Sequence, residues 1–103
     1  MELYQAEWCP HSHNVRQRLT ELGIGVTLRQ VPADADDRDE LRRVADTDEI
    51  PVLVGSDGRP RCGEDEILDY LDEFDERRDA DEHRDKAREE VPNFEEAART
   101  AAS

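Results

Sequence analysis

The chain has 103 residues, of which 28 are acidic and 14 basic, so its formal net charge at pH 7 is −14. This charge excludes nucleic-acid binding through clustered Lys and Arg. No apolar run approaches the ~20 residues that a helix needs to cross a bilayer. The N-terminus also lacks the basic and apolar leader of a secreted protein. We therefore expect a soluble, cytoplasmic, monomeric protein that binds neither nucleic acid nor membrane.

The basic residues are thirteen arginines and a single lysine, Lys86. An acid-rich, lysine-poor surface is typical of a protein of halophilic type, since the Debye length shrinks to ~3 Å in molar salt. Intrinsic disorder has a similar composition, but the large apolar residues are concentrated in residues 1–75. We therefore predict one folded domain over residues 1–75. An acidic helical extension that prolongs its last helix is expected over residues 76–90, and a flexible C-terminal tail over residues 91–103.

Hydrophobic periodicity within residues 1–75 predicts alternating strands and helices. Gly23 is expected to end the first helix, and Ser56-Asp57-Gly58 is a hairpin signal. The predicted elements, in chain order, are a strand at Glu2–Ala6, a helix at Ser12–Leu22, a strand at Val26–Val31, a helix at Asp36–Asp46, a strand at Ile50–Val54, a short strand ending near Cys62 and a helix at Glu64–Phe74.

The element order is therefore β-α-β-α-β-β-α. A parallel βαβ unit followed by a helix, a hairpin and a last helix predicts an α/β protein, a three-layer α/β/α sandwich with a mixed four-stranded sheet.

The candidate chemistry begins where the first strand meets the first helix, at Trp8-Cys9-Pro10-His11-Ser12. A cysteine at a helix start faces unpaired backbone N–H groups and the positive end of the helix dipole, and both favour the nucleophilic thiolate. Pro10 suits the first turn, where its missing N–H is not needed. The hydroxyl of Ser12 can donate to a thiolate but cannot form a disulfide. A small buried cysteine without chemistry is the alternative.

Three landmarks in this order resemble the glutaredoxin family: Trp-Cys-Pro-x-Ser at the helix start, Ile50-Pro51 before a strand, and Gly63-Glu64-Asp65 opening the last helix. The N-terminal domain of glutathione transferases is similar. The resemblance covers about residues 1–75. It implies a thioredoxin-like fold and thiol–disulfide exchange with a small γ-glutamyl thiol, the substrates being small-molecule thiols and proteins in mixed disulfides.

By this resemblance Cys9 is the nucleophile that carries the small thiol as a mixed disulfide. Pro51 matches the cis-proline of the family, and the peptide of Ile50 is expected to pair with the backbone of the bound thiol. An ordinary trans proline at a strand start is the alternative. Glu64 and Asp65 match the residues that hold the γ-glutamyl group. Plain capping of a helix by acidic residues is the alternative for this pair.

The chain departs from the family pattern in ways that bear on mechanism. Ser12 stands at the second cysteine position, which implies a monothiol enzyme. The basic residues that grip the glycine carboxylate of glutathione are replaced, by Ala6 before the motif and by acidic residues at 46–49. We therefore hypothesise that the co-substrate is either glutathione or a thiol that lacks the glycine, such as γ-glutamylcysteine.

Several side chains near the motif have two interpretations. Cys62, which replaces the first residue of the usual Gly-Gly pair, is either an apolar filler or a resolving thiol. His11 and His13 invite a metal site with Cys9, but they are two positions apart at a helix start and so point in different directions, and no metal is expected. His11 is expected to tune the thiolate instead. Trp8 is expected to pack as an aromatic wall.

Two other functions remain open at this stage. Some monothiol relatives bridge a [2Fe–2S] cluster between two subunits with two small thiols, but Pro10 and His11 differ from the Gly and Phe of that subgroup, so this function is not favoured. The third possibility is a non-catalytic interaction module on the same fold, which predicts an unperturbed Cys9 thiol.

Overall fold

The computed structural model describes residues 1–102, with side chains described as far as Val91. The predicted order β-α-β-α-β-β-α is confirmed, with one further helix after it. The elements are β1 Glu2–Gln5, α1 Pro10–Leu22, β2 Thr27–Gln30, a short 3₁₀ helix at Ala35–Asp37, α2 Asp39–Ala45, β3 Val52–Val54, β4 Pro60–Cys62, α3 Glu64–Leu71 and α4 Ala80–Ala102.

The four strands form one mixed sheet in the order β2-β1-β3-β4. β1 is parallel to β2, and β3 is antiparallel to both β1 and β4. The crossover through α1 makes the parallel pair, and the hairpin at Gly58, whose φ is 78°, makes the last antiparallel pair. This is the α/β, thioredoxin-like topology that the sequence predicts.

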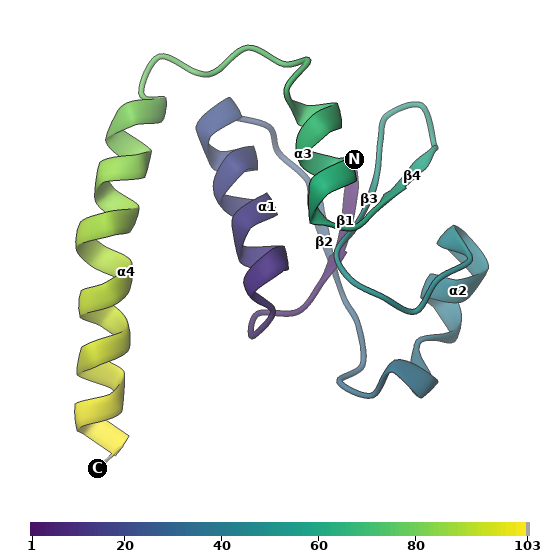
Figure 1. The fold of residues 1–103 in the computed structure, drawn as a ribbon, viewed down its shortest axis with the longest axis horizontal. Coiled ribbons are helices and arrows are strands. Elements are labelled where there is room, and N and C mark those ends of the chain that lie inside the picture. Colours follow the sequence, from purple (N-terminus) through teal and green to yellow (C-terminus); the bar gives the residue numbers. More distant parts are fainter. Residues whose placement is uncertain (103) are drawn as a thin grey trace.

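Alternation along β1 and β3 divides the core into two layers (Figure 1). Leu3 and Leu53 are fully buried against α1 and α3, while Tyr4 and Val52 pack on the other face against Leu41 of α2. The three-layer α/β/α sandwich is therefore confirmed. The sheet positions the N-termini of α1 and α3 close together, because both helices pack on the same face.

Two predicted elements differ in detail from the structure. All four residues of the edge strand β2 are exposed, and Leu28 has an exposed fraction of 43%. The strand pairs with a neighbour on one side only. The predicted helix over Asp36–Asp46 begins instead as a 3₁₀ turn and becomes α-helical at Asp39. Within α2 only Leu41 is buried, and Val44 lies on the exposed side.

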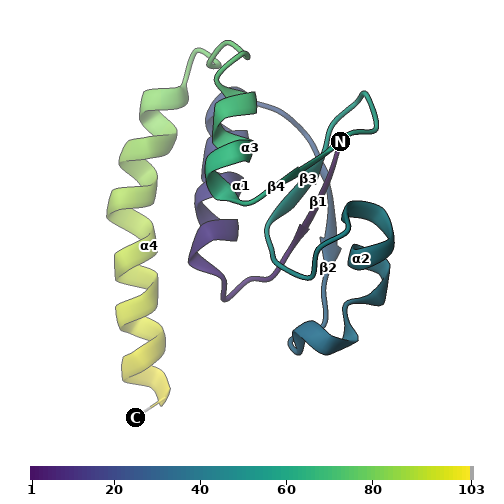
Figure 2. The same ribbon diagram turned by 45° about the vertical axis from the view of Figure 1, so that its right-hand side comes forward.

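The expectation that residues 76–90 prolong the last helix is wrong. α3 ends at Leu71, the chain turns, and α4 begins anew at Ala80 and runs antiparallel to α1 (Figures 1 and 2). Phe74 folds back to form an edge-on contact with Tyr70, and the Arg77 N–H donates to the carbonyl of Glu21 at 3.0 Å. These contacts turn the chain across the end of α1. The backbone of α4 is helical as far as Ala102, whereas Ser103 and the side chains from residue 92 of the expected tail lie outside the described residues.

A cluster of charges fixes α4 to α1. The carboxylate of Glu21, buried at the end of α1, accepts hydrogen bonds from Arg18 at 3.0 Å and from Arg84 of α4 at 2.7 Å. Glu76 contacts the same two guanidinium groups at 2.6 and 3.0 Å. Each of the two carboxylates thus pairs with both guanidinium groups, so none of these four charges is left unpaired at the contact between the helices.

The docking of α4 is predicted to weaken in acid. The hydrogen bonds from Arg84 and Arg18 hold the pKa of Glu76 at about 2, below the ordinary 4.5 of a glutamate. A carboxyl group with a lowered pKa stabilises the fold fully above 4.5, and this contribution is lost as the pH falls toward 2. Amide chemical shifts of Ala80 and Arg84 should move over this interval while that of the core residue Leu3 does not.

Glu76→Gln should reduce the shift of these two amides to the part that Glu21 and Asp81, the other carboxylates bonded to Arg84, contribute. The matched variant Glu82→Gln, which changes an exposed α4 residue outside the cluster, should retain the full shift. A flat titration of the α4 amides in the unsubstituted chain would contradict the assignment of Glu76.

Candidate functional site

Cys9 is the N-cap residue of α1. Its backbone is extended, with φ −83° and ψ 118°, and its sulfur accepts a hydrogen bond from the Ser12 N–H at 3.4 Å. Pro10 occupies the first helical turn, as predicted, and Cys9 is 6% exposed. The sulfur therefore takes the place of the side-chain oxygen that usually caps a helix, and it lies at the positive end of the helix dipole.

The surroundings of Cys9 favour the thiolate. Burial would raise the pKa of the thiol, but hydrogen bonds from the side chain and backbone of Ser12 and from the backbone of His11, together with the charge of Arg16, outweigh burial and hold the pKa below its ordinary value. Apart from the Cys9 sulfur, the fully buried hydroxyl of Ser12 has no hydrogen-bond partner in the described part of the chain. Because a thiolate is a strong acceptor beside this hydroxyl, ionisation of Cys9 would supply the missing partner.

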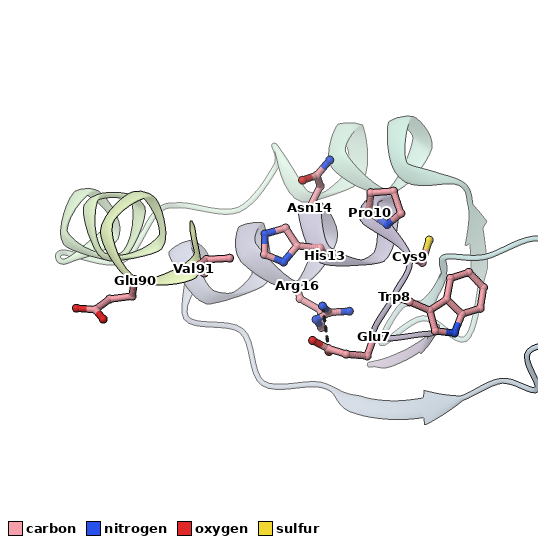
Figure 3. A pocket seen from close by; sticks show the side chains of 9 residues that line it. All are labelled: Glu7, Trp8, Cys9, Pro10, His13, Asn14, Arg16, Glu90 and Val91. Atoms are coloured by element: carbon pink, nitrogen blue, oxygen red, sulfur yellow. Dashed lines mark ion pairs between the residues drawn. The ribbon is translucent and has the colours of Figure 1, made fainter. Parts of the chain in front are cut away.

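Cys9 opens into a groove of about 720 Å³ between the start of α1 and the middle of α4. Figure 3 shows Trp8 beside Cys9 at one end of the groove, Glu90 and Val91 of α4 at the other, and Arg16 between them. The indole of Trp8 is 64% exposed and lines the groove, so it does not pack as the aromatic wall that the sequence predicts. The full set of lining residues is Glu7, Trp8, Cys9, Pro10, His13, Asn14, Arg16, Glu90 and Val91.

The four residues expected to bind the small thiol lie together in a second cleft, of about 470 Å³. The Ile50–Pro51 peptide bond is cis, as the resemblance implies. The Gly63 N–H donates to the Pro51 carbonyl at 2.9 Å, which joins the cis-proline loop to the start of α3. Within the described chain, the backbone N–H and C=O of Ile50 form no hydrogen bond. They are therefore available to an extended ligand.

Glu64 and Asp65 have different surroundings at the start of α3. The carboxylate of Glu64 accepts a hydrogen bond from Asn14 at 2.8 Å and lies 3.2 Å from Nδ1 of His11. Asp65 is exposed and its carboxylate has no partner among the described residues. The N-cap residue Gly63 provides no side-chain cap. Glu64 therefore ties α3 to α1, while Asp65 and the first N–H groups of α3 remain open to the cleft.

Cys62 does not line the groove at Cys9 but belongs to the second cleft. Both cysteines are free. Burial and the nearby carboxylate of Glu66 raise the pKa of the Cys62 thiol, which donates to the Ala45 carbonyl at 4.0 Å. These surroundings keep Cys62 protonated and suit the interpretation as a filler.

The two histidines of the motif point to different neighbours. His11 contacts Glu64, whereas His13 lines the groove beside Cys9. Among the described residues, no group of three or more His, Cys, Asp or Glu side chains is arranged to hold a metal ion. In the same part of the chain, no helix has the length and apolar character needed to span a membrane.

Sequence reasoning missed the groove and its residue Arg16. Arg16 follows Cys9 by seven positions, and the spacing Cys9, Ser12, His13, Arg16 (i, i+3, i+4, i+7) marks one face of a helix. That spacing was the available signal. Nothing in the sequence indicated that α4 would supply the opposite wall, because the anchor for α4 is a buried glutamate, Glu21, near the end of α1.

The fold defines a thioredoxin-like protein, with a cysteine of lowered pKa at the N-cap of its first helix. The glutaredoxin family model matches residues 1–59, more than half of the chain, and the chain belongs to the glutaredoxin family. Membership of this family implies a role in thiol redox chemistry.

Among solved structures, 18 chains match. One is the crystal structure of a glutathione S-transferase domain-containing protein from Marinobacter aquaeolei VT8, with a TM-score of 0.63 and 28% sequence identity. The match covers 73% of this chain but only 39% of that protein. No curated protein matches the chain.

The reactivities of Cys9 and Cys62 can be compared within the same chain. We predict that alkylation of Cys9 by iodoacetamide rises at a lower pH than alkylation of Cys62, since the pKa of the first thiol is lowered and that of the second is raised. Peptide mapping of the alkylated chain measures both midpoints in one experiment. Ser12→Ala should raise the midpoint of Cys9, and Ser56→Ala, in the exposed hairpin, should not. Equal midpoints for the two cysteines would contradict the account.

Proposed function

We propose that this chain is a thiol–disulfide oxidoreductase that acts by a monothiol mechanism through Cys9, with a small γ-glutamyl thiol as co-substrate. The observation that carries the proposal is the position of Cys9 as the N-cap of α1, where its pKa is lowered while its sulfur opens into a groove. A thiolate at neutral pH in an accessible site is the requirement for disulfide exchange.

The reaction proceeds in two exchanges. The Cys9 thiolate attacks the γ-glutamyl sulfur of a mixed disulfide, the S–S bond breaks, and the released thiolate takes the electron pair and is protonated by water. Cys9 then carries the γ-glutamyl thiol as a disulfide. A second γ-glutamyl thiolate attacks the γ-glutamyl sulfur of this disulfide. The bond to Cys9 breaks, a symmetric small disulfide leaves, and Cys9 is restored as the thiolate. Ser12 donates its hydrogen bond to the thiolate at the beginning and end of the cycle.

The cleft at the cis-proline is the proposed site for the γ-glutamyl thiol. The free N–H and C=O of Ile50 would pair with the cysteinyl backbone of the ligand, beside Pro51. The uncapped N–H groups of Glu64 and Asp65 would bind the α-carboxylate, and the Asp65 carboxylate would bind the α-ammonium group. The Glu64 carboxylate is already engaged by Asn14 and His11, so its part is to hold α3 in position.

The cleft also bears on which thiol is used. Its lining contains no Arg or Lys, and Glu49 stands beside Ile50 with no partner for the carboxylate that the glycine of glutathione would add. We therefore propose a thiol without the glycine, such as γ-glutamylcysteine. Exchange should be faster with γ-glutamylcysteine than with glutathione at the same concentration. Equal exchange rates with the two thiols would contradict the proposal of a thiol without the glycine.

Substitution of each cysteine tests the monothiol mechanism. Cys9→Ser should abolish exchange, because no other thiol reaches the groove, while Cys62→Ser should retain it, because the Cys62 thiol is held protonated. Intact-mass spectrometry after incubation with oxidised γ-glutamyl thiols should show one adduct, mapped to Cys9. An adduct that converts into a Cys9–Cys62 disulfide would contradict the monothiol mechanism. A Cys9 that reacts no faster than an ordinary thiol would favour a non-catalytic module.

Asp65 tests the γ-glutamyl site. We predict that Asp65→Asn raises the KM for the γ-glutamyl thiol about tenfold with little change in kcat, since one charge-assisted hydrogen bond contributes roughly 1.5–3 kcal/mol. Asp69→Asn, one turn further along α3, makes the same change of charge outside the cleft and serves as the control. Equal KM values for the two variants would show that Asp65 only caps the helix.

A further inference from the structure

The groove at Cys9 and the cleft at the cis-proline share no lining residue. A mixed disulfide has two halves, and the proposed function places only the γ-glutamyl half, in the cleft. The other half, which leaves as a thiol, needs space on another side of the Cys9 sulfur. With about 720 Å³, the groove has the size of a site for a small molecule.

The groove combines apolar surface with one cationic group. Trp8 is 64% and Val91 37% exposed, and both line it together with Pro10. Arg16 is the one Arg or Lys among the residues of its lining. The chain as a whole has a net charge of −14, so a cationic group in the groove stands out. The Arg16 side chain is held in place: it is 20% exposed, and one of its nitrogens donates to the amide oxygen of the buried Gln5. Gln5 is in turn held by its contact with Gln30 at 2.8 Å.

A carboxylate already occupies the outer side of Arg16. The carboxylate of Glu7 lies 3.2 Å from the guanidinium, and Figure 3 shows this ion pair within the groove. The Glu7 side chain is 90% exposed, so the pair is screened by solvent and is weak. Gln5, the inner partner, carries no charge. A ligand carboxylate can therefore displace Glu7 and pair with a guanidinium whose charge is otherwise unneutralised.

From these contacts we propose that the groove binds the leaving half of the disulfide, and that this half is a small apolar thiol bearing a carboxylate, which Arg16 binds in place of Glu7. The inference rests on the proposed function, because it assigns the second half of the same mixed disulfide. The chemistry is unchanged: Cys9 attacks the γ-glutamyl sulfur, and the carboxylate-bearing thiolate leaves with the electron pair and is protonated by water.

Two probes test the inference, namely the mixed disulfides of γ-glutamylcysteine with 3-(mercaptomethyl)benzoic acid and with its amide. The acid and the amide have nearly the same size, and the charged group is remote from the sulfur. Arg16 also lowers the pKa of Cys9, so its substitution slows both probes. The ratio of kcat/KM for acid over amide is independent of that effect and reports on the carboxylate alone.

We expect the unsubstituted chain to prefer the acid about tenfold, as for one charge-assisted pair. Arg16→Gln should bring the ratio to about one, whereas Arg59→Gln, an equal change of charge in the exposed hairpin, should leave it unchanged. Glu7→Gln should raise the ratio, because it removes the competing carboxylate. Glu7→Gln alters only an exposed side chain and keeps the test decisive if Arg16→Gln fails to fold.

A ratio near one in the unsubstituted chain, or a ratio that neither Arg16→Gln nor Glu7→Gln changes, would overturn the inference while leaving the proposed function intact. Failure of Cys9 to exchange with either probe would instead overturn the proposed function.

Discussion

The capping of α1 by the Cys9 sulfur is the interaction on which the rest of the site depends. The helix needs an acceptor at its first turn, and the sulfur supplies it through the Ser12 N–H. The same contact places the sulfur in the positive field of the helix and next to a buried hydroxyl without a partner. The groups that complete the first turn of α1 are thus the same groups that lower the pKa of the Cys9 thiol.

The remainder of the fold holds other groups around this helix start. The hydrogen bond from Gly63 to Pro51 joins the cis-proline loop to α3, and Glu64 joins α3 to α1 through Asn14. These two links bring one cleft to one side of the motif. On another side, Glu21 fixes α4 through Arg84, and α4 completes the groove at Cys9. The reactive sulfur therefore lies next to a groove whose second wall comes from outside the first 75 residues.

The sequence predicted most of the scaffold and the position of Cys9 at the start of α1. Period-two strands, Gly23 and the hairpin signal were local patterns, and local patterns determine strand and helix order. The break between α3 and α4 was missed because charged residues continue without a Gly or Pro, so nothing local marks it; contacts with Glu21, distant in sequence, produce the turn. Trp8 was expected to pack as an aromatic wall, yet it is exposed, because apolar character does not reveal which surfaces a neighbouring element covers. The spacing of Arg16 from Cys9 places both residues on one face of α1, and this could be read from the sequence. The contacts of Arg16 with Gln5 and Glu7 could not, because only the folded chain brings these residues together.

The central claim is that folding activates Cys9. The most direct measurement is the rate of exchange between Cys9 and a γ-glutamyl disulfide at neutral pH, in the Cys62→Ser chain, with and without enough urea to unfold it. The account predicts exchange at least about tenfold faster in the folded chain, since a lowered thiol pKa and a bound ligand both require the helix start and the cleft. Equal rates in the two states would contradict it, because the structure around Cys9 would then contribute nothing to its reactivity.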